Sequence, residues 1–204
     1  MKKYILPLVA AFAFFLFSGF LNEPAAFENI AVSHKTKEDT SLSVVTVDSV
    51  YSISISHHLV PSTELNQEAS LQYQDIYAEL YIIVINEPKD DFIKTSEESG
   101  EYDSTQSATV NYREIQMNAI ANSVSLETTP QIKKTTIGGL EAEIVEFIGK
   151  SEGIEDPIYY KCAFIDGKDN MYMVITWTLD EYKNKNTDEM DLMLNSFRLQ
   201  EVKK

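Results

Sequence analysis

Strict alternation of apolar and polar side chains marks residues 51–57, Tyr-Ser-Ile-Ser-Ile-Ser-His. Tyr51, Ile53 and Ile55 fall on one face and the serines on the other, which is the period of a half-buried β-strand. Residues 76–86 are largely apolar on both faces, a pattern typical of a central strand that is covered on both sides. The polar stretch between them, 64–73, predicts a short helix or a turn.

The longest helical pattern spans residues 106–126, with Asp103 or Ser104 as a candidate N-cap. Its apolar side chains fall on two sides, which predicts that the helix is contacted on both. Residues 95–105, just before it, are acidic and polar, and this composition favours a solvated loop. One side of the helix carries Ala108, Tyr112, Ile115 and Ala119, and the other carries Met117, Ile120 and Val124.

Strand patterns dominate from residue 131 onward. Gly138-Gly139 predicts a turn with positive φ, and Asp166-Gly167 suits the type I′ turn of a hairpin. These turns separate four predicted strands at 131–137, 140–148, 158–165 and 171–179.

A final helix is predicted over 187–196. Asn186, followed three residues later by Glu189, matches the looser form of a capping box. Acidic residues in the first turn also favour a helix start here, because they face the positive end of the helix dipole. A short edge strand at 198–202 completes the pattern.

The first 26 residues carry the pattern of a secretory signal peptide. Lys2 and Lys3 supply the positive start, and residues 5–21 follow without a charge. That run is at the lower limit for a membrane-spanning helix, so a short retained anchor is the alternative to cleavage near Ala25 or Ala26. No Cys follows the run, so a lipid anchor is not predicted. We expect an exported protein, located in the periplasm, in the cell envelope or outside the cell.

The rest of the chain divides into a spacer and one domain. Residues 27–48 are polar and mixed in charge, which predicts a flexible spacer, although the apolar stretch 44–47 is a candidate start of the fold. Residues 49–204 are enough for a single domain with a sizeable core.

Charge excludes some partners. The chain has 17 Lys plus Arg and 32 Asp plus Glu, a formal net charge of −15. Nucleic acid and anionic membrane surfaces attract clustered positive charge, so neither is an expected partner. Contact with a membrane is expected only through an uncleaved N-terminal segment.

Cys162 is the one cysteine of the sequence, so no intramolecular disulfide and no Cys-based zinc site is predicted. It lies in a strand pattern, where a free Cys behaves as a small buried hydrophobe. The same strands carry Trp177, Tyr159, Tyr160 and Tyr172, which fit core packing better than a ligand groove.

His57 and His58 are the candidate catalytic or metal-binding residues. Adjacent side chains on a strand point to opposite faces, so the pair is poorly placed to share one ion. No G-x-S-x-G motif supports a Ser-His-Asp triad. The hypothesis therefore assigns no catalytic, cofactor-binding or metal residue, and no cofactor.

Two acidic clusters are candidate calcium sites. Neither has the spacing of an EF-hand loop, so solvated charge is the preferred interpretation of both. The first cluster is Glu97, Glu98, Glu101 and Asp103, and the second is Asp166, Asp169 and Asn170.

The predicted elements follow one another in a recognisable order: Tyr51 to Ile55, Ile82 to Ile85, the helix 106–126, Ile137 to Ala142, Tyr159-Tyr160, Met171 to Ile175 and Ser196-Phe197. This order resembles the PsbP-like domains, which include the extrinsic photosystem subunit, bacterial DcrB-like proteins and Ran-binding import factors. About 150 residues carry the resemblance. The family's opening strand is commonly followed by Pro and then Trp, and here no Trp follows.

The resemblance implies an α+β fold: a three-layer α/β/α sandwich with a mostly antiparallel sheet and helices on both faces. It supplies no catalytic residue, and fold alone does not fix function. We therefore expect an exported, non-catalytic binding or accessory domain whose partner is an unknown protein or small ligand. The alternative is a small exported hydrolase that uses carboxylates without a recognisable motif, or His57 and His58.

Overall fold

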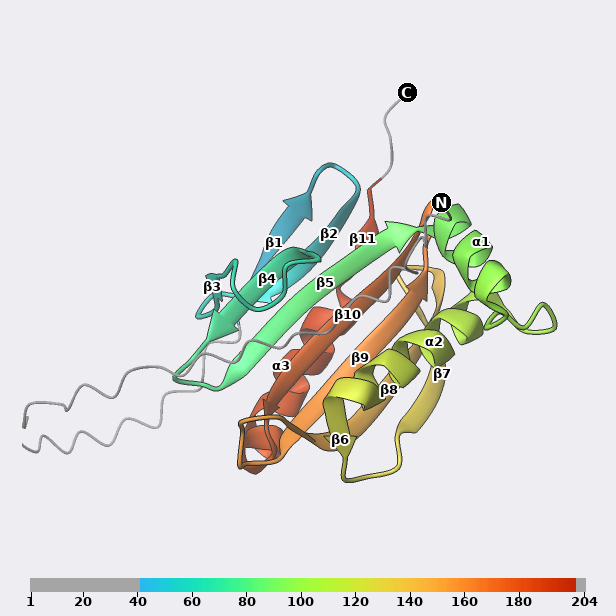
Figure 1. Cartoon of the computed structure of the whole chain (residues 1–204). Helices are drawn as coiled ribbons and strands as arrows, with labels where there is room; N and C mark the ends of the chain where they lie inside the picture. The colour runs from blue at the N-terminus through green and yellow to red at the C-terminus, as the bar shows by residue number, and fades with distance from the viewer. Residues whose placement is uncertain (1–40, 201–204) are drawn as a thin grey trace, which may run out of the picture.

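The computed structural model describes residues 41–200. It is a mixed α+β fold with a mostly antiparallel sheet, and Figure 1 shows its arrangement. The large sheet has eight strands in the order β3-β4-β5-β10-β9-β8-β6, and β7 also pairs with β8. Its strands are β3 (Val60–Pro61), β4 (Ala69–Asp75), β5 (Leu80–Pro88), β6 (Val124–Leu126), β7 (Gln131–Ile137), β8 (Leu140–Ser151), β9 (Ile158–Asp166) and β10 (Asn170–Leu179).

A second, three-stranded sheet lies over one face of the large sheet. Its order is β1-β2-β11, with β2 in the middle and both neighbours antiparallel to it. Tyr51, Ile53 and Ile55 of β2 face the large sheet and are buried. The strands are β1 (Leu42–Val47), β2 (Tyr51–Ser56) and β11 (Arg198–Leu199).

Helices cover both faces of the large sheet, because its central strands are apolar on both sides. On β5, Ile82 and Val84 join one core cluster and Ile83 joins the other. In Figure 1, α1 and α2 lie in front of the sheet, and α3 lies behind it beside the small sheet. The helices are α1 (Lys89–Ser99), α2 (Ala108–Ser123) and α3 (Lys183–Asn195), and a 3-10 turn, η1 (Asp180–Tyr182), precedes α3.

Several sequence predictions are confirmed. The alternating segment at 51–57 is β2, and the four predicted C-terminal strands are β7 to β10. The long helix exists as α2, but Ser107 caps it, and its last predicted residues form β6. The central strand predicted at 76–86 begins at Leu80, because residues 76–79 form the turn that leads into it.

The prediction of a loop at 95–105 is wrong over its first half. Residues up to Ser99 belong to α1, whose C-cap is Gly100 in the left-handed conformation. In this helix only Phe92 and Ser96 are buried. One apolar anchor in a charged segment gave too weak a period to predict a helix.

The prediction of a short helix or turn at 64–73 is also corrected, because β4 begins at Ala69. The predicted boundary between spacer and domain after residue 48 differs from the structure, whereas the candidate start of the fold at 44–47 lies inside strand β1, which begins at Leu42. In this strand Leu42, Val45 and Val47 pack on the core.

The capping box predicted at Asn186 is wrong. Helix α3 begins at Lys183, and Asn186 is a buried residue inside it. Its side-chain amide donates to the Ala78 carbonyl at 3.0 Å and to Thr178 Oγ1 at 2.8 Å. A tertiary contact, not a cap, accounts for this asparagine.

The predicted leader at 1–26 and most of the predicted spacer lie outside the described residues. Within 41–200, no helix is both long enough and apolar enough to cross a membrane.

Candidate protein-binding surface

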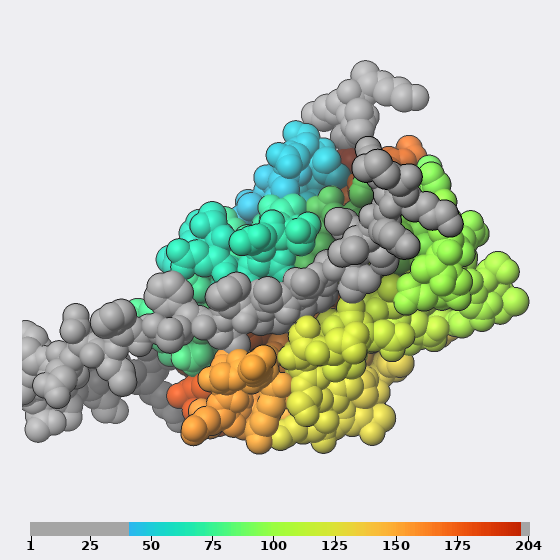
Figure 2. Space-filling model, in the orientation of Figure 1, coloured from blue at the N-terminus to red at the C-terminus, as the bar shows by residue number. Residues whose placement is uncertain are grey.

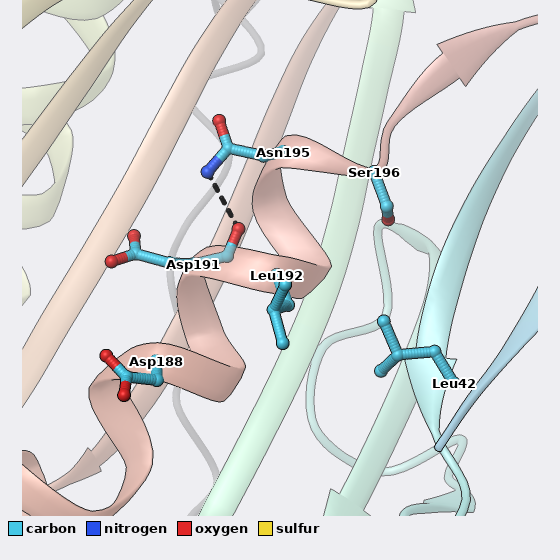
Figure 3. Close-up of a pocket in the computed structure, with 6 residues that line it drawn as sticks. All are labelled: Leu42, Asp188, Asp191, Leu192, Asn195 and Ser196. Carbon is cyan, nitrogen blue, oxygen red and sulfur yellow. Dashed lines mark hydrogen bonds between the residues drawn. The ribbon is translucent and has the colours of Figure 1, made fainter. Parts of the chain in front are cut away.

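A shallow, open hollow of about 570 Å³ lies between α3 and the start of β1. Figure 3 shows Leu192 of the helix on the side that faces Leu42 of the strand, while Asp188 and Asp191 project away from Leu42. The Asn195 amide donates to the Asp191 carbonyl at 2.8 Å and fixes the end of this helix face. The lining residues are Leu42, Asp188, Asp191, Leu192, Asn195 and Ser196.

The outer face of the small sheet continues this surface. The register pairs Val44 with Ser54 and Leu42 with Ser56. Val44 is turned away from the core, whereas Leu42 is half-buried at the margin of the core, where it also lines the hollow. Val44 is 72% exposed and Leu192 is 48% exposed. We call Leu42, Val44, Asp188, Leu192 and Asn195 the α3–β1 surface. Its apolar centre is bordered by two polar residues, Asp188 and Asn195.

Lys161 forms a network beneath one flank of α3. Its side chain is 5% exposed, its Nζ lies 3.1 Å from Glu146 Oε1, and it also pairs with Asp191. Burial alone would raise the pKa of Glu146, but hydrogen bonds from Tyr159 and Lys161 outweigh it and lower that pKa. This network ties α3 to the large sheet through two carboxylates that stay partly hydrated.

His58 bridges the other flank of α3 to the β4–β5 turn. Its Nδ1 lies 2.7 Å from Asp75 Oδ2, and its Nε2 lies 2.6 Å from Glu189 Oε1. Burial alone would lower the pKa of His58, but Asp75 and Glu189 outweigh it and raise that pKa. We call His58, Asp75 and Glu189 the His58 clamp. Because both ring nitrogens face a carboxylate, the clamp is a charge-assisted joint.

The structure places the two candidate histidines in separate settings. His57 Nδ1 lies 2.7 Å from Ser41 Oγ, whereas the carboxylates of Asp75 and Glu189 contact His58. A Ser-His-Asp triad needs the hydroxyl and the carboxylate on one imidazole. Among residues 41–200, no three His, Cys, Asp or Glu side chains are grouped to hold a metal ion.

The two acidic clusters have local uses. Asp103 Oδ1 accepts from the Thr105 hydroxyl at 2.7 Å and from the Thr105 amide at 2.9 Å, and these hydrogen bonds lower the pKa of Asp103. Asp166 Oδ1 lies 2.6 Å from Lys89 Nζ, which joins the β9–β10 hairpin to the start of α1. Neither cluster therefore converges on a common point.

The single cysteine and the aromatic residues pack in the core, as predicted. Cys162 is fully buried, and burial raises the pKa of its thiol. Trp177 and Tyr160 belong to the cluster under α1 and α2, and Tyr159 and Tyr172 belong to the cluster under α3.

Sequence reasoning missed the α3–β1 surface. Most of strand β1 lies within the predicted spacer, and the helix pattern at 187–196 does not single out Leu192. The usable signal was the uncharged run Leu-Ser-Val-Val-Thr-Val at 42–47, which stands out in an acidic chain. Lys161 also had a signal, as a lone charge in the apolar strand pattern 158–165.

The fold is similar to solved structures at low identity. The cyanobacterial PsbP protein CyanoP of Synechocystis sp. PCC 6803 has a TM-score of 0.51 and 8% identity, over 86% of this chain and 98% of that one. The Ran-binding protein Mog1p of Saccharomyces cerevisiae has a TM-score of 0.47 and 9% identity, over 79% and 97%. LpqN of Mycobacterium tuberculosis, involved in cell envelope biogenesis, has a TM-score of 0.39 and 11% identity, over 81% and 88%.

The similarity to CyanoP supports a PsbP-like fold, but not membership of a specific family. No protein-family model and no curated protein matches the chain. At such low identity the similarity concerns the fold alone, so function has to be argued from the surface of this molecule.

Proposed function

We propose that this protein is an exported, non-catalytic binding module, a three-layer α/β/α sandwich of the PsbP-like type, that holds a partner protein on the α3–β1 surface. The observation that carries the proposal is the apolar centre of this surface on a strongly acidic molecule. Apolar side chains that gather on a surface inside a polar rim are typical of protein-binding sites.

The shape of the hollow favours a protein over a small ligand. Small molecules bind in concave sites that bury most of their surface. Here Leu42 and Leu192 flank an open hollow, and Val44 extends the apolar area across the exposed face of the small sheet. A protein partner can cover Leu42, Val44 and Leu192 together, whereas a small ligand can cover only part of this apolar area.

The arrangement of polar groups favours binding over hydrolysis. In the His58 clamp both ring nitrogens are engaged by carboxylates, and the hydroxyl of Ser41 lies on the other histidine. A general base needs a free nitrogen within reach of a substrate or nucleophile. The clamp has none in this arrangement, so its role is to join elements.

Site-specific photo-crosslinking in the source cells tests the proposed surface. A photoreactive side chain is placed at Leu192 in the full chain, and the matched control places it at Lys133, which is exposed on β7. We expect a discrete adduct of higher mass from position 192 that is absent from position 133. Equal adducts at both positions, or none at position 192, would contradict the proposal.

Export is tested separately, by fractionation and by N-terminal sequencing of the recovered protein. We expect the protein in the envelope or the medium, with a new N-terminus near residue 26. Retention of the intact chain at the membrane would favour the short anchor over cleavage. Recovery of the intact chain in the cytosol would contradict export.

A further inference from the structure

Strand β1 is an edge strand without the features that protect the other sheet edges. Free strand edges pair with other chains unless they are short or carry charge or proline. Strand β3 has two residues and includes Pro61, and β7 carries Lys133 and Lys134. Strand β1 has six residues, Leu-Ser-Val-Val-Thr-Val, without a charge, a proline or a glycine.

The hydrogen-bond phase identifies which backbone groups of β1 face outward. The His57 amide donates to the Ser41 carbonyl at 3.1 Å, which makes this a hydrogen-bonded pair. Such pairs recur at every second residue, so Ser43, Val45 and Val47 direct their backbone groups to β2. The N–H and C=O groups of 42, 44 and 46 therefore point to the outer edge of the small sheet, where no strand within residues 41–200 pairs with β1. Figures 1 and 2 show β1, in blue, at the margin of the small sheet and on the molecular surface.

Acidic residues lie near both ends of this uncharged strand. Asp48 follows it directly, and Asp188 lines the same hollow as Leu42, the first residue of the strand. The whole chain has a net charge of −15. A segment with cationic ends and an uncharged centre complements this arrangement, whereas a second copy of the chain brings the same negative charge.

We propose that an extended segment of the partner protein pairs with the free edge of β1, with an uncharged, alternating centre and Lys or Arg at its ends. This inference rests on the proposed function and deepens it, because it names the chemistry of the partner. Backbone hydrogen bonds to residues 42, 44 and 46 hold the segment, and its outward apolar side chains extend the face that carries Leu42 and Val44.

The probe is a synthetic peptide of sequence Lys-Thr-Val-Thr-Val-Thr-Lys, blocked at both ends, and its control replaces both Lys by Glu. Amide hydrogen exchange of the full chain is followed by NMR with and without each peptide. We expect the Lys peptide to slow the exchange of the amides of Leu42, Val44 and Thr46. The amides of Ser43 and Val45 are already bonded within the sheet and should change little.

The matched substitutions are Val44→Pro and Val44→Thr. Proline removes the outward N–H but no bond to β2, so an edge strand tolerates it there, and threonine keeps the N–H. We expect Val44→Pro to weaken peptide binding at least about tenfold and Val44→Thr to change it less than about threefold, measured by fluorescence anisotropy. The Glu peptide should bind unaltered protein more weakly than the Lys peptide, and added salt should reduce the difference.

Four outcomes would overturn the inference. The first is no binding of the Lys peptide, and the second is binding that Val44→Pro leaves unchanged. The third is an exchange pattern without the alternation. The fourth is self-association of the chain in sedimentation that Val44→Pro abolishes, which would assign the edge to a second copy. If the peptide fails while position 192 still crosslinks to a partner, the proposed function stands and this inference alone falls.

Discussion

Glu143 of β8 is a buried carboxylate that pairs with Arg113 of α2, and this ion pair helps to hold α2 on the large sheet. Arg113 Nε donates to Glu143 Oε2 at 2.8 Å, and the Glu143 side chain is 2% exposed. A second cation, Lys134, lies 3.7 Å from Glu143 on a side chain that is 81% exposed. Arg113→Met therefore leaves an interior carboxylate with one distant, solvated partner.

The magnitude follows from this geometry. Removing one partner of a buried ion pair costs about 3–5 kcal/mol, because the remaining charge stays desolvated. The exposed Lys134 offsets about 0.5–1 kcal/mol of this cost. We expect a net loss of about 2–4 kcal/mol in the free energy of unfolding, which corresponds to a fall in Tm of about 5–15 °C for a domain of this size.

The assay is urea and thermal unfolding followed by circular dichroism. The control is the double variant Arg113→Met/Glu143→Met, which replaces the pair by apolar side chains of similar volume. We expect it to unfold within about 1 kcal/mol of the unaltered protein, because both the charge and its desolvation are gone. The reasoning is refuted if Arg113→Met costs less than about 1 kcal/mol, or if the double variant is no more stable than the single one.

Three further predictions concern the clamp, a tight turn and the cysteine. His58→Gln should cost about 0.5–1 kcal/mol below pH 6.5, a modest value because the pair is partly exposed. Asp75 and Glu189 raise the His58 pKa, so this stabilisation is present at acidic pH and is lost as the pH rises through the pKa of His58 in the folded protein. Urea unfolding of the unaltered protein and of His58→Gln measures it, and a difference in stability that grows at alkaline pH would contradict the prediction. Gly138→Ala should destabilise the fold by about 1–3 kcal/mol more than Gly139→Ala. Both glycines have positive φ, but a Cβ at Gly138 would lie 2.7 Å from the Phe197 carbonyl oxygen, whereas a Cβ at Gly139 meets nothing within 4 Å. Equal losses of stability in thermal unfolding would contradict the clash. Cys162 should react with a thiol reagent no faster than the protein opens, because it is fully buried, and rapid labelling of the folded protein would show otherwise.

The strands were predictable where burial imposes a period on the sequence. Tyr51, Ile53 and Ile55 alternate because one face of β2 meets the core, and the buried strands β9 and β10 are almost continuously apolar. The helix α1 was not predictable in the same way, since tertiary contact at Phe92 holds a segment that is otherwise charged. A period of apolar residues appears in the sequence only where one face of an element is buried. Helix α1 buries too few side chains to produce such a period.

The surface contacts were beyond sequence reasoning for a different reason. The His58 clamp joins positions separated by 17 and 131 residues, and no local pattern encodes such a meeting. Asn186 gave a misleading signal, because a polar residue that satisfies a buried carbonyl looks like a helix cap in the sequence. The edge of β1 was readable only after the register of the small sheet was known, because the phase of its backbone groups decides which amides are free.

The proposed surface is made of two elements that are fixed to each other. The Ser54 amide donates to Ser196 Oγ at 2.7 Å, and the rings of Tyr51 and Phe197 stack with centroids 5.2 Å apart. The His58 clamp adds a charge-assisted joint at Glu189, in the middle of α3. A preorganised surface loses less conformational entropy on binding than a loose one. A substitution that breaks one of these joints at a residue that does not touch the partner should therefore weaken partner binding. Because no contact with the partner is lost, such a substitution measures the contribution of rigidity alone.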